Sequence, residues 1–371
     1  MRVHLKDIVS FSKGKQINGD DLVDGGQYVF LNGGINPSGK WNEYNVEGNS
    51  IAISEGGNSC GYVNYMSEPF WCGAHCYFLY DLKYDAKYTY YALKSQQDRI
   101  MQLRSGACMP NIKKNSLGEF SFLIEEDIAK QALVVASLDK VSELIALRKE
   151  QLAKLDDLVK SRFVELFGTV KNNHQEYPVI KISGCAKLQG GFAFKSSDYL
   201  DNGIRLVQIS NVNKDTLDWD SINCVPQTFL QKYKDFELHV GDLVLAMTRP
   251  VIKSLDAVKI ATVSENDVPS LLNQRVGRFI IDITKINSTY LMLCCQMTEF
   301  REYVEAMSGN SLQPNISSKQ VEDYSIILPP LELQNQFAAF VEQTDKSKLA
   351  VQKSLDKLET LKKALMQKYF G

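Results

Sequence analysis

The sequence contains a gapless internal duplication that limits how the chain can fold. Residues 151–168 align with residues 354–371, both segments end in Phe-Gly, and seven of the eighteen aligned positions are identical. A second repeat lies upstream of each copy, where Ser-Gly followed by Pro-Asn-Ile occurs within 105–112 and again within 308–316. Because the two repeats occur in the same order, we infer two copies of one unit, each a globular segment followed by a helix, joined in tandem.

Length and composition indicate a chain with more than one domain. At 371 residues and 44% hydrophobic content, the chain has room for two or three domains with cores of their own. Long apolar stretches and the apolar core of a signal peptide are lacking, so we expect a cytoplasmic protein. The eight cysteines are irregularly spaced and predict reduced thiols. A net charge of −2 does not decide for or against a polyanionic partner, which needs only a local basic face.

Apolar residues at three- and four-residue spacing predict two long amphipathic helices, over 127–168 and 330–371. Gly168 is expected to cap the first helix, and Pro329-Pro330 is compatible with the start of the second. The first helix is also expected to carry Arg148 and Arg162 at two inward positions. The predicted apolar stripe of the first helix consists of Leu138, Val141, Ile145, Leu152, Leu155, Val159 and Leu166. That of the second consists of Val351, Leu355, Leu358, Leu365 and Tyr369.

The segments that precede the helices have the texture of strand-rich domains. Short runs of β-branched and aromatic residues, such as Tyr28–Leu31 and Leu243–Ala246, are separated by Gly, Asn and Asp. Each segment also contains one predicted internal helix, over 88–104 and 289–307. The predicted fold class is therefore α+β. We place the domains at 1–126 and 179–329, the long helices at 127–168 and 330–371, and a linker at 169–178.

The short linker constrains the direction of the second helix. Residues 169–178 reach about 35 Å when fully extended, whereas a helix of roughly 30–40 residues is about 45–60 Å long. The second domain must therefore begin near the C-terminal end of the first helix. We expect an antiparallel coiled coil with pseudo-two-fold symmetry, the globular domains far apart, and residues 1–5 near residue 371.

One short motif resembles a phosphate-binding loop. Residues 34–40 nearly match G-x-x-x-x-G-K-[ST], but Trp41 stands where the motif needs a hydroxyl for Mg²⁺. Asn36-Pro37-Ser38 also predicts a turn rather than the start of a helix. We therefore favour a β-turn that presents Lys40 and Trp41 at a surface.

A second motif contains possible zinc ligands. Cys60, Cys72, His75 and Cys76 have the right chemistry, but a strand over 71–80 would turn Cys72 and Cys76 to one face and His75 to the other. We favour a buried strand and expect no metal site. Motifs for amino-group methylation and for its cofactor are likewise missing, so we expect no catalytic residues and a binding role.

Loops rich in Lys, Arg, Asn, Gln and aromatic residues form the candidate binding surface. Arg, Asn and Gln can read base edges in DNA, while Lys contacts phosphate. Any one of these residues can equally be ordinary polar surface, so the prediction rests on the set. In the first copy the candidates are Lys13, Lys15, Lys40, Trp41, Arg104, Lys113, Lys114 and Asn115. In the second copy they are Gln189, Lys195, Arg249, Lys253, Asn273, Gln274, Arg275 and Lys319, with Arg278 beside them.

Four features together carry a family resemblance. They are the order domain, helix, domain, helix; the repeated Ser-Gly and Pro-Asn-Ile segments; the passage 326–334 leading into 337–341; and the two Phe-Gly helix ends. In these the chain resembles the specificity subunit of type I restriction-modification enzymes. The resemblance implies that each globular domain is a target recognition domain for one half of a split double-stranded DNA sequence. It also implies that the helices set the gap and dock two methyltransferase subunits, which restriction subunits can join. Methylation and cleavage would reside in those partners, leaving this chain non-catalytic and without cofactors.

The sequence departs from a perfect duplication at the first junction, and two alternatives stay open. Residues 122–127 stand where the second copy has Leu-Pro-Pro-Leu-Glu, so the first domain–helix junction is expected to differ in angle. One alternative is the specificity subunit of a system whose partner fuses modification and cleavage. The other is a coiled-coil scaffold with two protein-binding modules that do not bind DNA. Salt-dependent DNA affinity would discriminate the last from the others.

Overall fold

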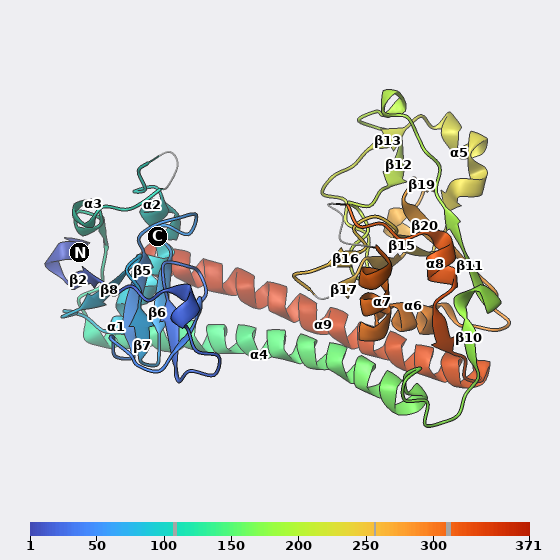
Figure 1. Cartoon of the computed structure of the whole chain (residues 1–371). Helices are drawn as coiled ribbons and strands as arrows, with labels where there is room; N and C mark the ends of the chain where they lie inside the picture. Colours follow the sequence, from blue (N-terminus) through green and yellow to red (C-terminus); the bar gives the residue numbers. More distant parts are fainter. Residues whose placement is uncertain (107–109, 256, 309–312) are drawn as a thin grey trace. The chain divides into compact units, whose positions relative to one another are not determined.

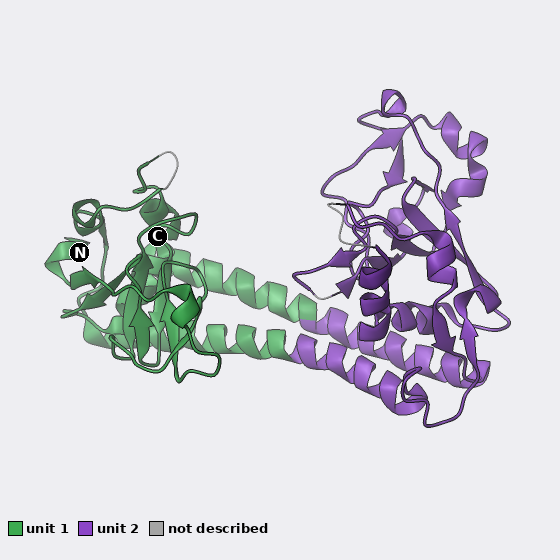
Figure 2. Cartoon of the chain, in the orientation of Figure 1, with its two compact units in different colours: residues 1–150, 352–371 green, residues 151–351 purple. Residues whose placement is uncertain are grey.

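The computed structural model describes residues 1–106, 110–255, 257–308 and 313–371 (Figure 1). Cys108 and Gly309, which entered the sequence predictions, lie outside these residues. The chain forms two compact units: unit 1 contains residues 1–150 and 352–371, and unit 2 contains residues 151–351 (Figure 2). Both units include part of each long helix, α4 (Ile128–Phe167) and α9 (Leu331–Phe370). The division into domains made from the sequence, which keeps each helix whole, stays a prediction. Within the described residues, no helix is long and apolar enough to cross a membrane.

Unit 1 is built on a four-stranded and a three-stranded sheet. Its strands are β1 (Arg2–His4), β2 (Ser10–Lys13), β3 (Tyr28–Leu31), β4 (Gly39–Trp41), β5 (Ser50–Ser54), β6 (Val63–Met66), β7 (Phe70–Cys72), β8 (Cys76–Tyr80) and β9 (Ser121–Leu123). The larger sheet has the order β2-β8-β5-β6 and is antiparallel throughout. The smaller has the order β4-β3-β7, with β3 and β7 parallel. A separate ribbon pairs β1 with β9.

Unit 2 repeats this topology. Its strands are β10 (Val179–Lys181), β11 (Ala186–Gly190), β12 (Ile204–Val207), β13 (Cys224–Val225), β14 (Glu237–Leu238), β15 (Leu243–Ala246), β16 (Val251–Ile252), β17 (Ala257–Val258), β18 (Ile260–Thr262), β19 (Ser270–Leu272), β20 (Val276–Ile281) and β21 (Ser325–Ile327). The sheet β11-β20-β15-β18 corresponds to β2-β8-β5-β6. The sheet β13-β12-β19-β14 contains the parallel pair β12 and β19, and β10 pairs with β21. The duplication seen in the sequence therefore extends to the strand order of both main sheets.

The prediction of a single internal helix in each copy is wrong, because two shorter helices lie in place of each predicted one. The helices are α1 (Ala86–Ser95), α2 (Gln97–Met101) and α3 (Lys114–Gly118) in unit 1, and α5 (Thr228–Lys232), α6 (Ser288–Gln296), α7 (Thr298–Ser308) and α8 (Ser318–Glu322) in unit 2. In unit 1 the Gln97 side chain donates to the Gly61 carbonyl at 2.7 Å and accepts from the Val63 amide at 3.0 Å. These contacts anchor the start of α2 to the chain around β6. In unit 2 Met297 is extended (φ −69°, ψ 151°) and separates α6 from α7.

The two long helices pack antiparallel within each unit. In unit 1, Lys149 Nζ of α4 lies 3.0 Å from Glu359 Oε1 of α9, while Leu138, earlier in α4, shares a core with Phe370 at the end of α9. In unit 2, Lys348 Nζ lies 2.6 Å from Asp156 Oδ1. There the rings of Phe163 and Phe337, later in α4 and earlier in α9, are 5.7 Å apart. The predicted antiparallel pairing is confirmed, while the separation of the globular domains stays a prediction.

The buried stripe of α4 follows a different path from the predicted one over its second half. Val159, Phe163 and Phe167 are buried at a spacing of four residues. Arg162, predicted to point inward, is exposed and pairs with Glu165 at 2.8 Å. A helix can bury residues at steps of three or of four. Here the four-residue step places the large rings of Phe163 and Phe167 in the buried row, and Arg162 therefore turns to solvent.

The Phe-Gly helix ends close the cores of the two units in the same way. Phe167 is fully buried in unit 2, with its ring centroid 4.9 Å from that of Tyr290. Phe370 is buried in unit 1, 5.5 Å from the ring of Tyr88. Gly168 follows with φ +72°, and a Cβ there would lie 2.3 Å from the Asn172 carbonyl oxygen, so this cap requires glycine.

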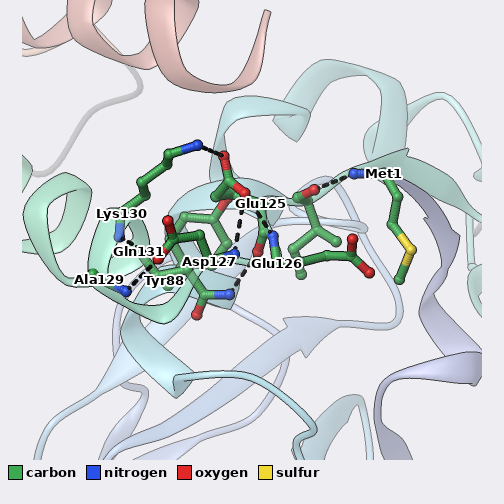
Figure 3. Close-up of polar contacts among 9 residues, drawn as sticks. Met1, Tyr88, Glu125, Glu126, Asp127, Ala129, Lys130 and Gln131 are labelled. Carbon is green, nitrogen blue, oxygen red and sulfur yellow. Dashed lines mark hydrogen bonds and ion pairs between the residues drawn. The ribbon is translucent and has the colours of Figure 1, made fainter.

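The start of α4 is held by a network of side-chain contacts (Figure 3). Asp127 Oδ1 accepts from the backbone amides of Ala129 at 2.9 Å and Lys130 at 3.3 Å, which makes Asp127 the N-cap. The buried Gln131 side chain donates to the Glu125 carbonyl at 2.6 Å. A side chain from the first turns of α4 therefore holds the helix to the segment that precedes it.

The start of α9 uses the equivalent glutamine. Gln334 is buried, donates to the Pro329 carbonyl at 2.8 Å and accepts from the Asn287 amide at 2.9 Å. A buried glutamine thus anchors both junctions although Pro-Pro is present only in the second. Val3 and Phe370 belong to the same core cluster of unit 1, and the closeness of residues 1–5 to residue 371 stays a prediction.

Candidate nucleic-acid interface

The Pro-Asn-Ile segment of unit 1 is attached to the chain that follows β5. The Ile112 amide donates to the Glu55 carbonyl at 2.9 Å, and the Gly57 amide donates to the Pro110 carbonyl at 3.0 Å. The Glu55 amide in turn donates to the His75 carbonyl at 2.9 Å. Three loops are therefore tied together at one end of the larger sheet.

The Pro-Asn-Ile segment of unit 2 makes the same contacts after β15. The Ile316 amide donates to the Met247 carbonyl at 2.8 Å, and the Arg249 amide donates to the Pro314 carbonyl at 2.8 Å. The Met247 amide donates to the Arg275 carbonyl at 2.8 Å. This correspondence aligns the two units residue by residue: Arg249 occupies the place of Gly57, and Arg275 that of His75.

The candidates of unit 1 lie on or beside these tied loops. Lys13 Nζ is 2.6 Å from Glu55 Oε1, so this lysine is paired within the loop cluster. Lys15 accepts at its carbonyl from Trp71 Nε1 at 2.9 Å, and the Trp71 ring is 6.4 Å from that of Trp41. The remaining candidates of this unit are all exposed: Lys40, Arg104, Lys113, Lys114 and Asn115.

Arg249 and Arg275 stand out among the candidates of unit 2. Both side chains are exposed, and both residues have positive φ values, 48° and 67°. The left-handed region costs a residue with a Cβ roughly 1–2 kcal/mol. Unit 1 has glycine, with φ +78°, at the place of Arg249. Unit 2 therefore has a charged side chain at a position where the backbone conformation favours glycine. The other exposed candidates of unit 2 are Lys195, Lys253, Gln274 and Lys319.

Two predicted contact residues of unit 2 make hydrogen bonds within the fold. Asn273 is only 3% exposed, and its Nδ2 donates to the Tyr199 hydroxyl at 3.3 Å, which leaves no surface for a base. Gln189 accepts from Arg278 Nη2 at 2.7 Å, and Arg278 is also 3.2 Å from Asp242. The prediction of direct contact is corrected for the buried Asn273, while the contact predicted for Gln189 stays a prediction.

Lys259 is a further basic residue of this face that the sequence analysis missed. It is half-buried, and its Nζ donates to the Ile209 carbonyl at 3.3 Å. Burial and the neighbouring Arg249 guanidinium lower its pKa. The sequence carries no signal for this pair, because it forms only when the strands before and after the β16–β17 hairpin come together.

The chemistry of the cysteine cluster is that of a core. The strand predicted over 71–80 is instead two strands, β7 and β8, in different sheets, with a turn at Gly73 whose amide donates to Leu31. Cys72 and Cys76 are buried, and the hydrogen bond between them, with burial, raises the pKa of the Cys72 thiol. Among the described residues, no three His, Cys, Asp or Glu side chains are placed to hold a metal ion.

The segment that resembles a phosphate-binding loop lies in a hairpin. The Ser38 amide donates to the Phe30 carbonyl at 2.8 Å, and Gly39–Trp41 pairs with β3 as strand β4. A phosphate-binding loop requires a helix at this point. The segment therefore has the wrong geometry for that role.

Comparison with known proteins identifies a family with sequences similar to this chain. The sequence model of the type I restriction modification DNA specificity domain matches residues 1–157 and 174–362. The specificity subunit of the type I restriction enzyme MjaVIII of Methanocaldococcus jannaschii is 26% identical over 294 residues, which span 76% of this chain and 68% of that protein. A putative type I specificity subunit of Mycoplasma pneumoniae is 31% identical over 218 residues, which span 54% of this chain and 56% of that protein.

A solved structure shares the fold. The crystal structure of the S subunit of a type I restriction-modification system from M. genitalium aligns over 100% of this chain and 96% of its own, with a TM-score of 0.66 and 20% identity.

Two strand-rich units of one topology, each completed by both long helices and each with a loop cluster tied in the same way, define a duplicated α+β protein. The chain belongs to the family of type I restriction-modification DNA specificity domains.

Proposed function

We propose that this chain is the sequence-reading subunit of a type I restriction-modification complex. Each unit reads one half of a split double-stranded DNA target, and the paired helices set the unread gap and dock two methyltransferase subunits. Methylation, cleavage and their cofactors belong to the partners, so the chain supplies no catalytic group of its own. The same assignment covers a system whose partner fuses modification and cleavage.

One observation carries this proposal: the two loop clusters share a backbone but not their side chains. Glu55-Gly56-Gly57 and Met247-Thr248-Arg249 make matching backbone hydrogen bonds to the two Pro-Asn-Ile segments. His75 corresponds to Arg275 in the same way. A common scaffold with divergent side chains is what two readers of unrelated sequences require, because base contacts give specificity while the scaffold positions them.

The side chains of unit 2 also have the chemistry of base recognition. Arg249 and Arg275 are exposed guanidinium groups, and arginine forms bidentate hydrogen bonds with the O6 and N7 atoms of guanine. Lys259 lies beside Arg249, and basic side chains are suited to the phosphate-rich surroundings of DNA. A protein-binding scaffold would not require exposed arginines at two positions with a left-handed backbone.

The test is a selection from random DNA with the complex reconstituted from this chain and its methyltransferase subunits. We expect Arg249→Ala with Arg275→Ala to relax one block of the target, by about 1–3 kcal/mol of discrimination for each lost base contact, and to leave the other block intact. Arg162→Ala, which removes an exposed arginine of α4 in the same unit, is the matched control and should leave both blocks unchanged. Unaltered preferences at both blocks in the double variant would show that these loops are not the readers.

A further inference from the structure

A groove rich in lysine lies between α1 and the helix pair of unit 1. Its volume is about 780 Å³, and it opens beside the end of α1 and the facing surfaces of α4 and α9. We call it the lysine groove. Its lining includes Tyr62, Lys94, Lys149, Glu359, Lys362 and Lys363.

The positive charge of the lysine groove is only partly compensated. Lys149 pairs with Glu359 at 3.0 Å, and Glu359 is the one acidic side chain that lines the groove in the part of the chain that the structure describes. Four ammonium groups therefore face one side-chain carboxylate, or two carboxylates if a terminal one is present at Gly371. Lys94 Nζ is held by the Val63 carbonyl at 2.9 Å and lies 3.4 Å from the centre of the Tyr62 ring.

The electrostatics of the buried lysines point the same way. Burial, and then the charge of Lys362, lower the pKa of Lys94 to about 8. Burial, and then the charge of Lys149, lower the pKa of Lys362, while the carboxylates of Asp139 and Glu359 oppose this shift without cancelling it. An anion in the groove would relieve the repulsion among these ammonium groups, because a nearby opposite charge favours the charged form of each.

The corresponding groove of unit 2 has the opposite character. It has a volume of about 530 Å³ and is lined by three lysines and four carboxylates, those of Asp156, Asp215, Glu342 and Asp345. Lys348 lies 2.6 Å from Asp156 and 3.3 Å from Asp345, so its charge is neutralised locally. With the repeat offset of 203 residues, Lys160 stands in the place of Lys363 and Val159 in that of Lys362. The uncompensated charge of unit 1 is therefore not a by-product of the shared fold.

We propose that the lysine groove binds backbone phosphate groups of the DNA, as a contact independent of sequence that unit 1 makes and unit 2 does not. This rests on the proposed function. Lysine contacts phosphate as a compact point charge and carries no base information. One side of the groove lies near a predicted DNA-binding residue: Gly61, next to Tyr62, packs against Met101, and the Arg104 amide donates to the Met101 carbonyl at 3.4 Å.

The test measures DNA affinity as a function of salt for the reconstituted complex. Each lost phosphate contact lowers the slope of log affinity against log salt by about 0.9, so Lys362→Gln with Lys363→Gln should lower it by up to about 1.8. Between 50 and 200 mM salt the variant should therefore lose about tenfold less affinity than the parent complex. At low salt the variant should bind both target and scrambled duplexes more weakly than the parent complex. The loss of affinity should be equal for the two duplexes, because phosphate contacts do not depend on sequence.

Two further variants separate charge from folding and from position. Lys362→Arg with Lys363→Arg keeps both charges and should retain the parent slope. Lys160→Gln is the equivalent change in the groove of unit 2 and should leave the slope unchanged. A parent slope in the glutamine variant, or an equal effect of Lys160→Gln, would overturn the proposal.

Failure of the groove and failure of the proposed function give different results. If the parent complex shows no preference for any DNA sequence, the proposed function fails. The groove proposal then fails with it, because it rests on that function. If the parent complex prefers its target but the glutamine variant keeps the parent slope, only the groove assignment fails. Loss of methyltransferase binding with an unchanged slope would assign the groove to an acidic protein segment and refute the phosphate assignment.

Discussion

Inserting one heptad into each long helix is predicted to widen the unread gap of the DNA target. A heptad after Leu152 and another after Leu355 keep the apolar stripe in phase, because the repeat of the stripe is seven residues. Both sites lie within four residues of the boundaries between the units, so each unit keeps its own helix pairing. Seven residues add about 10.5 Å at ~1.5 Å each, which corresponds to about three base pairs at ~3.4 Å per step.

Rotation decides how tightly the lengthened protein binds. Three base pairs turn B-form DNA by about 100°, whereas one heptad leaves a straight helix about 20° short of two full turns. The variant with one heptad should therefore select a wider gap but bind with lower affinity. Three heptads add about nine base pairs of length. Nine base pairs fall about 50° short of a full turn of DNA, and three heptads lag by about 60°, so this variant should recover affinity.

The assay sequences the methylated sites produced by complexes that contain the parent chain or the variants with one or three heptads. The two blocks should stay unchanged while the gap grows by about three and about nine base pairs at the spacing given above. A heptad inserted into α4 alone is the control, since it breaks the pairing of α4 with α9 and should abolish assembly. An unchanged gap, or altered blocks, would show that the helices are not the spacer.

Three further predictions concern single properties of the chain. Arg249→Gly should raise the free energy of unfolding by about 1 kcal/mol, because it relieves a left-handed backbone, yet relax one half-site; denaturant titration and site selection measure the two effects. Phe167→Ala should lower the free energy of unfolding by about 3–5 kcal/mol in unit 2, which thermal unfolding detects. Purified alone, the chain should neither methylate nor cut DNA nor hydrolyse ATP, and calorimetry should detect no S-adenosylmethionine binding; clear binding would refute that assignment.

The elements with strong periodicity were predictable from the sequence. The long helices α4 and α9 are repeated, apolar at regular spacing and bounded by glycine or proline, and each of these signals acts locally along the chain. Their antiparallel pairing followed from the length of the linker. The turn of Arg162 toward solvent was not predictable, because three- and four-residue steps are equally helical and only the packing of Phe163 and Phe167 in unit 2 selects between them.

The candidate site was predictable as a set of loops but not residue by residue. Asn273 has a side chain that can form hydrogen bonds with a base edge, yet it is buried against Tyr199. Its burial depends on contacts with a loop more than sixty residues away in the sequence, which local composition does not reveal. The lysine groove was missed for the same reason. Lys94, Lys149 and Lys362 come from three separate helices and meet only in the fold.

The proposed function requires that the chain reads two separate DNA blocks, one with each unit. The most direct measurement is sequencing of the sites methylated by the complex of this chain with its methyltransferase subunits, compared with those methylated by the Arg249→Ala and Arg275→Ala double variant. We expect two unrelated short blocks separated by a gap of fixed length, with only one block relaxed in the variant. A single continuous site, or a variant that relaxes both blocks together, would contradict it.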